Sequence, residues 1–115
     1  MHNNMITVEI RKNTKDSIIG FTVSGHSNYG EYGSDIVCSA VSALAQTTVL
    51  GLKVVANVKV KHSIKDGFLS CDVPDIENRD KALKTSAIMD TMVLGLMNIQ
   101  KNYSSYVTIT IKEEV

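Results

Sequence analysis

The sequence has few of the residues that stabilise very small or extracellular domains, and neither charge is in excess. It contains no tryptophan, one proline and two cysteines in 115 residues. Two cysteines are too few for a disulfide scaffold, so we expect reduced thiols that serve packing or reactivity. Twelve basic and twelve acidic residues balance to a formal net charge of zero. A neutral chain lacks the basic surface that phosphate backbones attract, so direct nucleic-acid binding is not expected.

Targeting segments are also not expected. The N-terminal stretch MHNNMITVEI carries neither a basic start nor an apolar run, so it is not typical of a secretory signal, and we expect a cytoplasmic protein. The longest uncharged run is the seventeen residues between Asp35 and Lys53. That length is at the lower limit for a membrane span, and serine, threonine and glutamine occupy its middle. We therefore predict a buried core helix and no membrane association.

The length predicts a single domain over residues 1–115. Segments in which apolar residues alternate, as in half-buried strands, are 5–13, 17–26, 58–64, 68–73 and 106–114. Helical spacing predicts helices over 35–56 and 80–103, and Asp66-Gly67 predicts a tight hairpin. The order ββαββαβ predicts an α+β fold, in which two helices pack on a mostly antiparallel sheet of about five strands.

The second predicted helix has more apolar surface than a two-layer domain of this size can bury. Between Ala87 and Met97 it is apolar over most of its circumference. A second copy of the chain is the simplest partner for such a surface, so we expect a homodimer.

The segment GHSNYGEYGSDIVCSAVSAL, residues 25–44, places a histidine and a cysteine at the two ends of a glycine-containing loop. Ser34 or Asp35 is the expected N-cap, which puts Cys38 in the first helical turn. Unpaired amides and the helix dipole there stabilise a thiolate, and the same amides can hold an oxyanion. His26 ends the second strand and can meet Cys38 to accept its proton. The alternatives are an inert, buried Cys38 and a structural His26.

Other residues of this segment have two possible uses each. Asp35 either orients the imidazole or caps the helix. Ser42 lies one turn after Cys38 on the same helical face, so its hydroxyl either reaches the site or bonds back to a helical carbonyl. Gly30 and Gly33 allow the loop over residues 27–34 to bend and move as a lid.

The remaining cysteine and one further histidine fit packing better than chemistry. Cys71 is in phase with Leu69 on its strand, which indicates a core position. His62 is in phase with Val60 and Ile64, which indicates a half-buried side chain.

Two other kinds of site are disfavoured. In GEYGSD no lysine follows the glycines and Asp35 would repel an anion, so a phosphate cradle is not expected. Zinc needs three or four ligands. The histidines and cysteines available for a metal, which show no ligand-like spacing, are His2, His26, Cys38, His62 and Cys71. We expect no metal and no cofactor.

Residues 25–44 resemble the signature of the ribosomal-processing cysteine proteases, the Prp family. The shared pattern is Gly-His, a glycine-bearing loop, Asp-Ile-Val-Cys, and a serine four residues after the cysteine. Outside this segment the similarity is one of layout: an initial MITV strand, a methionine-rich second helix and a closing strand. The four residues before Met5 and the lysine-rich stretch 58–67 depart from the pattern.

The resemblance implies a small α+β homodimer that acts as a cysteine endopeptidase. Family members remove a short N-terminal extension from bacterial large-subunit ribosomal protein twenty-seven. Cys38 would be the nucleophile and His26 the general base, with Asp35 and Ser42 in supporting positions. Residues 27–34 would close on an extended peptide that carries aromatic residues before the cut.

The resemblance also implies a group of residues that contact substrate or form the lid, namely Gly25, Tyr29, Gly30, Tyr32, Gly33 and Ser34. The two tyrosines either contact the substrate or only pack the loop. Two other functions remain open at this point. One is a non-catalytic, ribosome-associated interaction module with a structural cysteine, and the other is a redox-sensing thiol.

Overall fold

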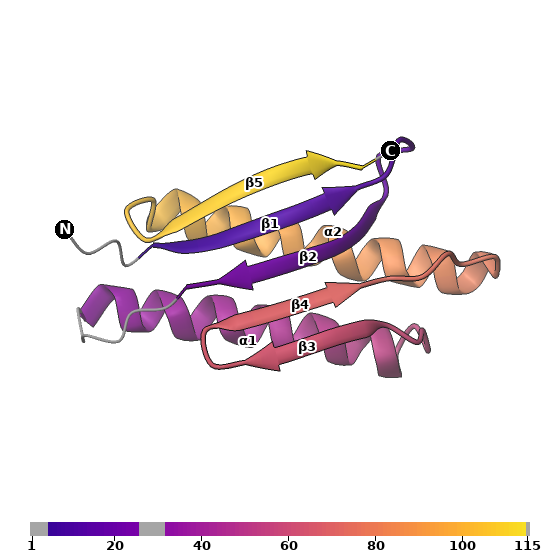
Figure 1. Ribbon diagram of the computed structural model, residues 1–115, viewed down its shortest axis with the longest axis horizontal. Helices are drawn as coiled ribbons and strands as arrows, with labels where there is room; N and C mark the ends of the chain where they lie inside the picture. Colours follow the sequence, from indigo (N-terminus) through magenta and orange to yellow (C-terminus); the bar gives the residue numbers. More distant parts are fainter. Residues whose placement is uncertain (1–4, 26–31, 115) are drawn as a thin grey trace.

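The structure is a computed structural model that describes residues 5–25 and 32–114, with the backbone alone over 32–35. Seven elements follow one another in the ββαββαβ order predicted from the sequence (Figure 1). They are β1 (Ile6–Lys12), β2 (Ile18–Ser24), α1 (Tyr32–Val54), β3 (Lys61–Lys65), β4 (Phe68–Asp72), α2 (Arg79–Asn102) and β5 (Val107–Glu113).

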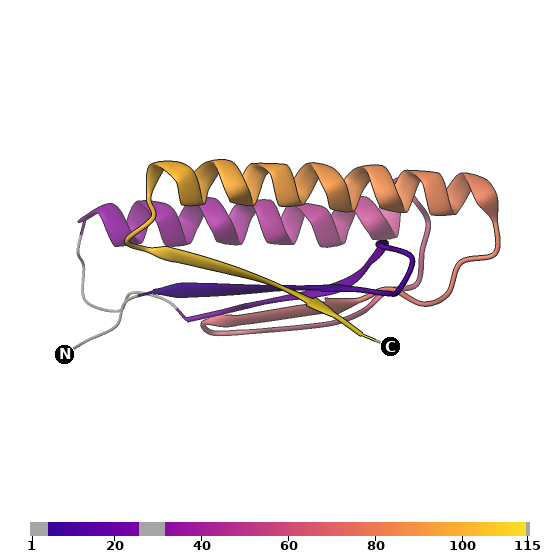
Figure 2. The same ribbon diagram turned by 90° about the horizontal axis from the view of Figure 1, so that it is seen from above.

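The strands form one five-stranded sheet in the order β3-β4-β2-β1-β5. The pairs β1–β2, β2–β4 and β3–β4 are antiparallel, and β1–β5 is parallel. Both helices lie side by side on the same face of this sheet (Figure 2). The predicted α+β fold with a mostly antiparallel sheet is confirmed.

The core lies between the sheet and the helices. Alternation along β1 turns Ile6, Val8 and Ile10 to one face, where each is buried. Neighbouring strands and both helices complete the layer with Phe21, Val23, Val41, Ala45, Val49, Leu52, Leu69, Cys71, Met89, Met92, Leu96 and Val107. The sheet face that carries these side chains is therefore the one that the helices cover.

The two helices approach closely where glycine leaves room. A Cβ at Gly95 of α2 would lie 2.8 Å from Leu44 Cδ2 of α1, and one at Gly51 would lie 3.6 Å from Ile88 Cγ2. Residue numbers fall along α1 as they rise along α2, so the helices are antiparallel. This packing fixes the position of α1 above the sheet.

The predicted start of the first helix is wrong. α1 begins at Tyr32, three residues before Asp35, so Tyr32, Gly33 and Ser34 belong to the helix and not to a lid loop. Neither Ser34 nor Asp35 is the N-cap. The amides of a helix's first turn have no hydrogen-bond partner within the helix, and the helix dipole favours an acidic residue there. Polar and acidic residues therefore suit the first turn as well as the cap position.

The third strand is also shorter than predicted. β3 begins at Lys61, and His62 is exposed where a half-buried side chain was expected. The reason is its place in the sheet, because β3 is an edge strand. The predicted hairpin is confirmed: Lys65 pairs with Phe68 across a turn in which Gly67 has a φ of 72°.

α1 is one helix whose segment Ile36–Val54 is long and apolar enough to span a membrane by length and composition alone. Its inward side chains at helical spacing belong to the hydrophobic core, and they include Val37, Val41, Ala45, Val49 and Leu52. That arrangement is typical of the core helix of a layered domain.

Candidate active site

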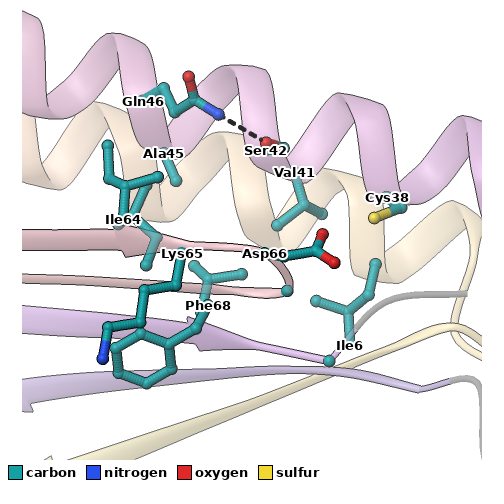
Figure 3. Close-up of a pocket in the computed structure, with 14 residues that line it drawn as sticks. Ile6, Cys38, Val41, Ser42, Ala45, Gln46, Ile64, Lys65, Asp66 and Phe68 are labelled. Atoms are coloured by element: carbon teal, nitrogen blue, oxygen red, sulfur yellow. Dashed lines mark hydrogen bonds between the residues drawn. The ribbon is translucent and has the colours of Figure 1, made fainter.

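A cleft of about 330 Å³ lies between α1 and the β3–β4 hairpin (Figure 3). α1 lines it with Cys38, Val41, Ser42, Ala45 and Gln46. The hairpin lines it with Ile64, Lys65, Asp66, Gly67, Phe68 and Leu69, and Ile6, Val23 and Gly25 complete the wall. The sequence motif and the Asp-Gly hairpin, far apart in the chain, thus enclose the same cavity.

Cys38 is half-buried and lines this cleft. It is the seventh residue of α1, so it lies in the second turn and not in the first as predicted. Its amide lies beyond the first four of the helix, inside the hydrogen-bonded part. The expected role of that amide in holding an oxyanion is therefore wrong. The thiol itself remains accessible from the cleft.

Gly25 brings the end of β2 to the same cleft. Its amide donates to the carbonyl oxygen of Gly67 at 3.0 Å. Its φ is 90°, and a Cβ there would lie 2.8 Å from the carbonyl oxygen of Met5, so only glycine fits without strain. The next residue in the chain, His26, lies outside the described residues. The chain thus reaches the wall of the cleft one residue before the predicted base.

Ser42 also lines the cleft, one turn after Cys38. Its hydroxyl oxygen accepts a hydrogen bond from Gln46 Nε2 at 2.9 Å (Figure 3). Back-bonding to a helical carbonyl occurs elsewhere: Thr48 donates to the carbonyl oxygen of Leu44 at 2.8 Å. Ser42 thus lines the cleft with its hydroxyl bonded to Gln46, and its supporting role at Cys38 remains a prediction.

The other predicted site residues are placed only in part. Tyr29 and Gly30 lie outside the described residues, as His26 does. Asp35 and the segment 32–34 are in the first turn of α1, with backbone alone described. The roles predicted for His26, Tyr29, Gly30 and Asp35 remain predictions, as does substrate contact by residues 32–34.

The sequence did not lead us to predict that the β3–β4 hairpin forms one wall of the cleft, here called the hairpin wall. Ile64 and Phe68 flank the Asp66-Gly67 turn, and although apolar they are 52% and 39% exposed. Both line the cleft opposite α1 (Figure 3). The signal available in the sequence was an apolar residue on each side of the Asp66-Gly67 turn, while their exposure is seen only in the structure.

The second thiol lies outside this site. Cys71 is fully buried in the core, as its phase predicted. Burial, reinforced by the charge of Asp72 and partly opposed by Arg11, raises the pKa of Cys71 to about 11. Among the described residues, no group of three or more histidine, cysteine, aspartate or glutamate side chains converges as metal ligands do.

Comparison with known proteins agrees with this geometry. The family described as cysteine protease Prp has a model that matches residues 5–108. The chain belongs to the Prp family. It is a cysteine protease, as the resemblance of residues 25–44 implied.

Individual relatives of this Prp-family chain cover almost its whole length. The Bacillus subtilis protein named ribosomal processing cysteine protease Prp is 26% identical over 108 residues, which are 92% of this chain and 96% of that protein. The crystal structure of SMU.848 from Streptococcus mutans is 30% identical, has a TM-score of 0.83, and aligns with 96% of this chain and 99% of its own.

A third relative carries a peptide. The Prp of Staphylococcus aureus, described as an essential ribosomal processing protease in complex with a substrate peptide, is 25% identical with a TM-score of 0.83. The alignment covers 94% of this chain and all of that one. The ββαββαβ fold of this chain is therefore the Prp fold.

Proposed function

We propose that this Prp-family enzyme removes the N-terminal extension of bacterial large-subunit ribosomal protein twenty-seven, with Cys38 as nucleophile and His26 as general base. One observation carries the proposal: Cys38 opens into a cleft whose wall includes Gly25, the residue before His26. The names of the relatives, ribosomal processing cysteine proteases, support the choice of substrate.

The reaction follows from these two side chains. The imidazole of His26 takes the proton of the Cys38 thiol, and the sulfur attacks the scissile carbonyl carbon. The imidazolium then gives its proton to the leaving amine as the C–N bond breaks, which leaves an acyl-enzyme. Water, deprotonated by the same imidazole, releases the new carboxylate and restores the thiol. Asp35 and Ser42 support the pair.

The cleft suits an extended peptide with bulky apolar side chains. Ile64 and Phe68 offer exposed apolar surface along the hairpin, opposite the helix that carries Cys38. Covering this surface on binding removes it from water, which favours aromatic residues near the cut. Residues 27–31, which connect β2 to α1 in the chain, would close over such a peptide.

The proposal includes a homodimeric enzyme that acts in the cytoplasm. Exposed apolar residues along α2 supply surface for a second copy. The balanced charge favours a peptide substrate over direct nucleic-acid binding.

The decisive experiment mixes the protein with the extended ribosomal protein and follows the products by mass spectrometry. The wild type should make one cut, and Cys38→Ala and His26→Ala should each abolish it. Cys71→Ala is the matched control, because it removes the other thiol outside the cleft and should retain cleavage. Cleavage by Cys38→Ala would overturn the proposal. Binding of the substrate without any cut by the wild type would favour the interaction module instead.

A further inference from the structure

We infer that the outer edge of β3 binds the backbone of the substrate, so that an extended peptide joins the sheet as a sixth strand beside the cleft. The groups involved are the backbone amides and carbonyls of His62 and Ile64, which the proposed mechanism does not use. The inference says how the peptide is held, and it rests on the proposed function, which supplies the peptide.

The residues on either side of β4 show which way its backbone groups point. The Val73 amide donates to the carbonyl oxygen of Ile19 at 2.9 Å, and the Gly67 carbonyl accepts from the Gly25 amide at 3.0 Å, so both bond toward β2. Successive residues of a strand direct their backbone groups to opposite sides. The residues of β4 that bond toward β3 are therefore the even-numbered ones, Phe68, Ser70 and Asp72.

The register of the hairpin then decides which groups of β3 are free. The even-numbered residues of β4 pair with Lys61, Ser63 and Lys65. These three use their backbone groups within the hairpin, so the groups of His62 and Ile64 point away from β4. β3 is the terminal strand of the sheet, and no strand among the described residues pairs with its outer side. Two amides and two carbonyls are thus available there to an extended chain.

This free edge borders the cleft. The side chain of Ile64 lines the cleft and is 52% exposed, and the turn that follows it lines the cleft as well. In Figure 3 Ile64 lies toward one end of the cleft and Cys38 toward the other, with Asp66 between them. A peptide paired with β3 therefore runs toward Cys38 and turns alternate side chains into the cleft. Recognition of this kind takes affinity from main-chain hydrogen bonds and specificity from the alternate side chains.

The charges beside the edge favour a peptide over a second copy of the chain. Lys61 and Lys65 are exposed at the two ends of β3. Two identical edges paired antiparallel about Ser63 would bring these lysines opposite one another, and like charges directly opposite are destabilising. Lysines on an edge strand commonly prevent such self-pairing. A peptide without basic residues at those positions meets no such repulsion.

The first test places the change in the peptide. Isothermal titration calorimetry gives the Kd of Cys38→Ala for a peptide that spans the extension and the cut site of ribosomal protein twenty-seven. The backbone nitrogens of the peptide are methylated one at a time. Every second methylation should weaken binding by about three- to tenfold, the loss of one hydrogen bond to β3, and those between should change Kd by less than about twofold.

The second test removes an amide from the protein. Proline is tolerated on an edge strand where its nitrogen faces outward, as at Ile64. In the same Cys38→Ala background, Ile64→Pro should bind the peptide about three- to tenfold more weakly than Ile64→Ala, which also shortens the side chain but keeps the amide.

Ile111→Pro on β5, the strand at the opposite edge of the sheet, is the matched control. The Glu114 amide donates to the Lys12 carbonyl on the β1 side, so by alternation the Ile111 amide points away from β1. Ile111 is exposed, as Ile64 is, but does not line the cleft. Ile111→Pro should therefore bind the peptide as tightly as its Cys38→Ala parent.

A methylation scan without a two-residue period, or equal Kd values for Ile64→Pro and Ile64→Ala, would overturn the inference. Loss of a dimer in Ile64→Pro during sedimentation would also overturn it, because the edge would then belong to a second copy. The scan uses one protein throughout, so it decides the matter even if the proline variant folds poorly. These outcomes leave the proposed function standing, whose own failure would show as cleavage by Cys38→Ala.

Discussion

The amide of Gly25 donates to the carbonyl oxygen of Gly67 at 3.0 Å, which joins the end of β2 to the turn of the β3–β4 hairpin. The bond continues the ladder in which Ser24 pairs with Phe68. Sheet and hairpin thus form one wall of the cleft as a continuous unit, and α1 forms the other. Gly25, the residue before the predicted base in the sequence, lies on the first wall, and the predicted nucleophile, Cys38, lies on the second.

Gly25→Ala should lower both stability and activity. The residue has a φ of 90°, and its new Cβ would lie 2.8 Å from the Met5 carbonyl oxygen. A side chain in that conformation costs about 1–3 kcal/mol, and relief of the clash would shift the backbone that leads to His26. We expect a lower free energy of unfolding in urea and a lower kcat/KM for peptide cleavage.

The matched control is Gly51→Ala, whose Cβ would meet Ile88 Cγ2 at 3.6 Å, an ordinary van der Waals distance. It lies within α1, where alanine is favoured over glycine by about 1 kcal/mol, so it should be at least as stable as the wild type. An unchanged free energy of unfolding in Gly25→Ala would show that a side chain at position 25 causes no strain.

The two thiols should react very differently. Cys71 is fully buried, and burial raises its pKa from 9.0 to about 11, so at pH 8 it is protonated as well as inaccessible. Cys38 opens into the cleft. Iodoacetamide at pH 8 should therefore add one label to the native protein, at Cys38, and a second label only in urea. Peptide mass mapping distinguishes the two positions. Labelling of Cys71 before unfolding would contradict the burial.

The hairpin wall should determine how well peptides bind. Phe68→Ser removes apolar surface from the cleft, and because the side chain is 39% exposed the fold should tolerate it. Loss of a contact of this size corresponds to about a tenfold rise in KM for a peptide with aromatic residues, with kcat little changed. Steady-state kinetics on the wild type and the variant give both constants.

Ile111→Ser on β5 is the control for that measurement, since Ile111 is also exposed but does not line the cleft. Its KM should match that of the wild type. Equal KM values for Phe68→Ser and the wild type would show that Phe68 of the hairpin does not contact the substrate.

Local patterns in the sequence were enough to predict the element order and most of the core. Alternation determines which face of a strand is buried, as Val8 and Phe21 illustrate, and Asp66-Gly67 requires a tight turn. The start of α1 could not be predicted, because polar residues such as Ser34 are equally suited to a cap and to a first turn.

The cleft itself was only half predictable. Cys38 and Ser42 could be placed on one helical face, because that depends on local periodicity alone. His62, in phase with Ile64, was expected to be half-buried, but an edge strand separated from α1 by the cleft leaves both side chains exposed. Such exposure depends on the order of strands in the sheet, which alternation does not encode. The bond from Gln46 to Ser42 depends on rotamers, which the sequence does not encode either.

The exposed face of α2 should hold a second copy of the chain. Leu83 and Leu94 are 60% and 69% exposed and lie eleven residues apart, about three helical turns, so they share a face, with Met97 (49% exposed) beside them. Leu94→Lys would place a charge in the buried interface, so it should convert a dimer to a monomer in sedimentation equilibrium at micromolar concentration. Ile111→Lys adds the same charge to an exposed apolar position on β5 and should leave the dimer intact. If the wild type sediments as a monomer, or if Leu94→Lys stays dimeric, the interface is not on α2.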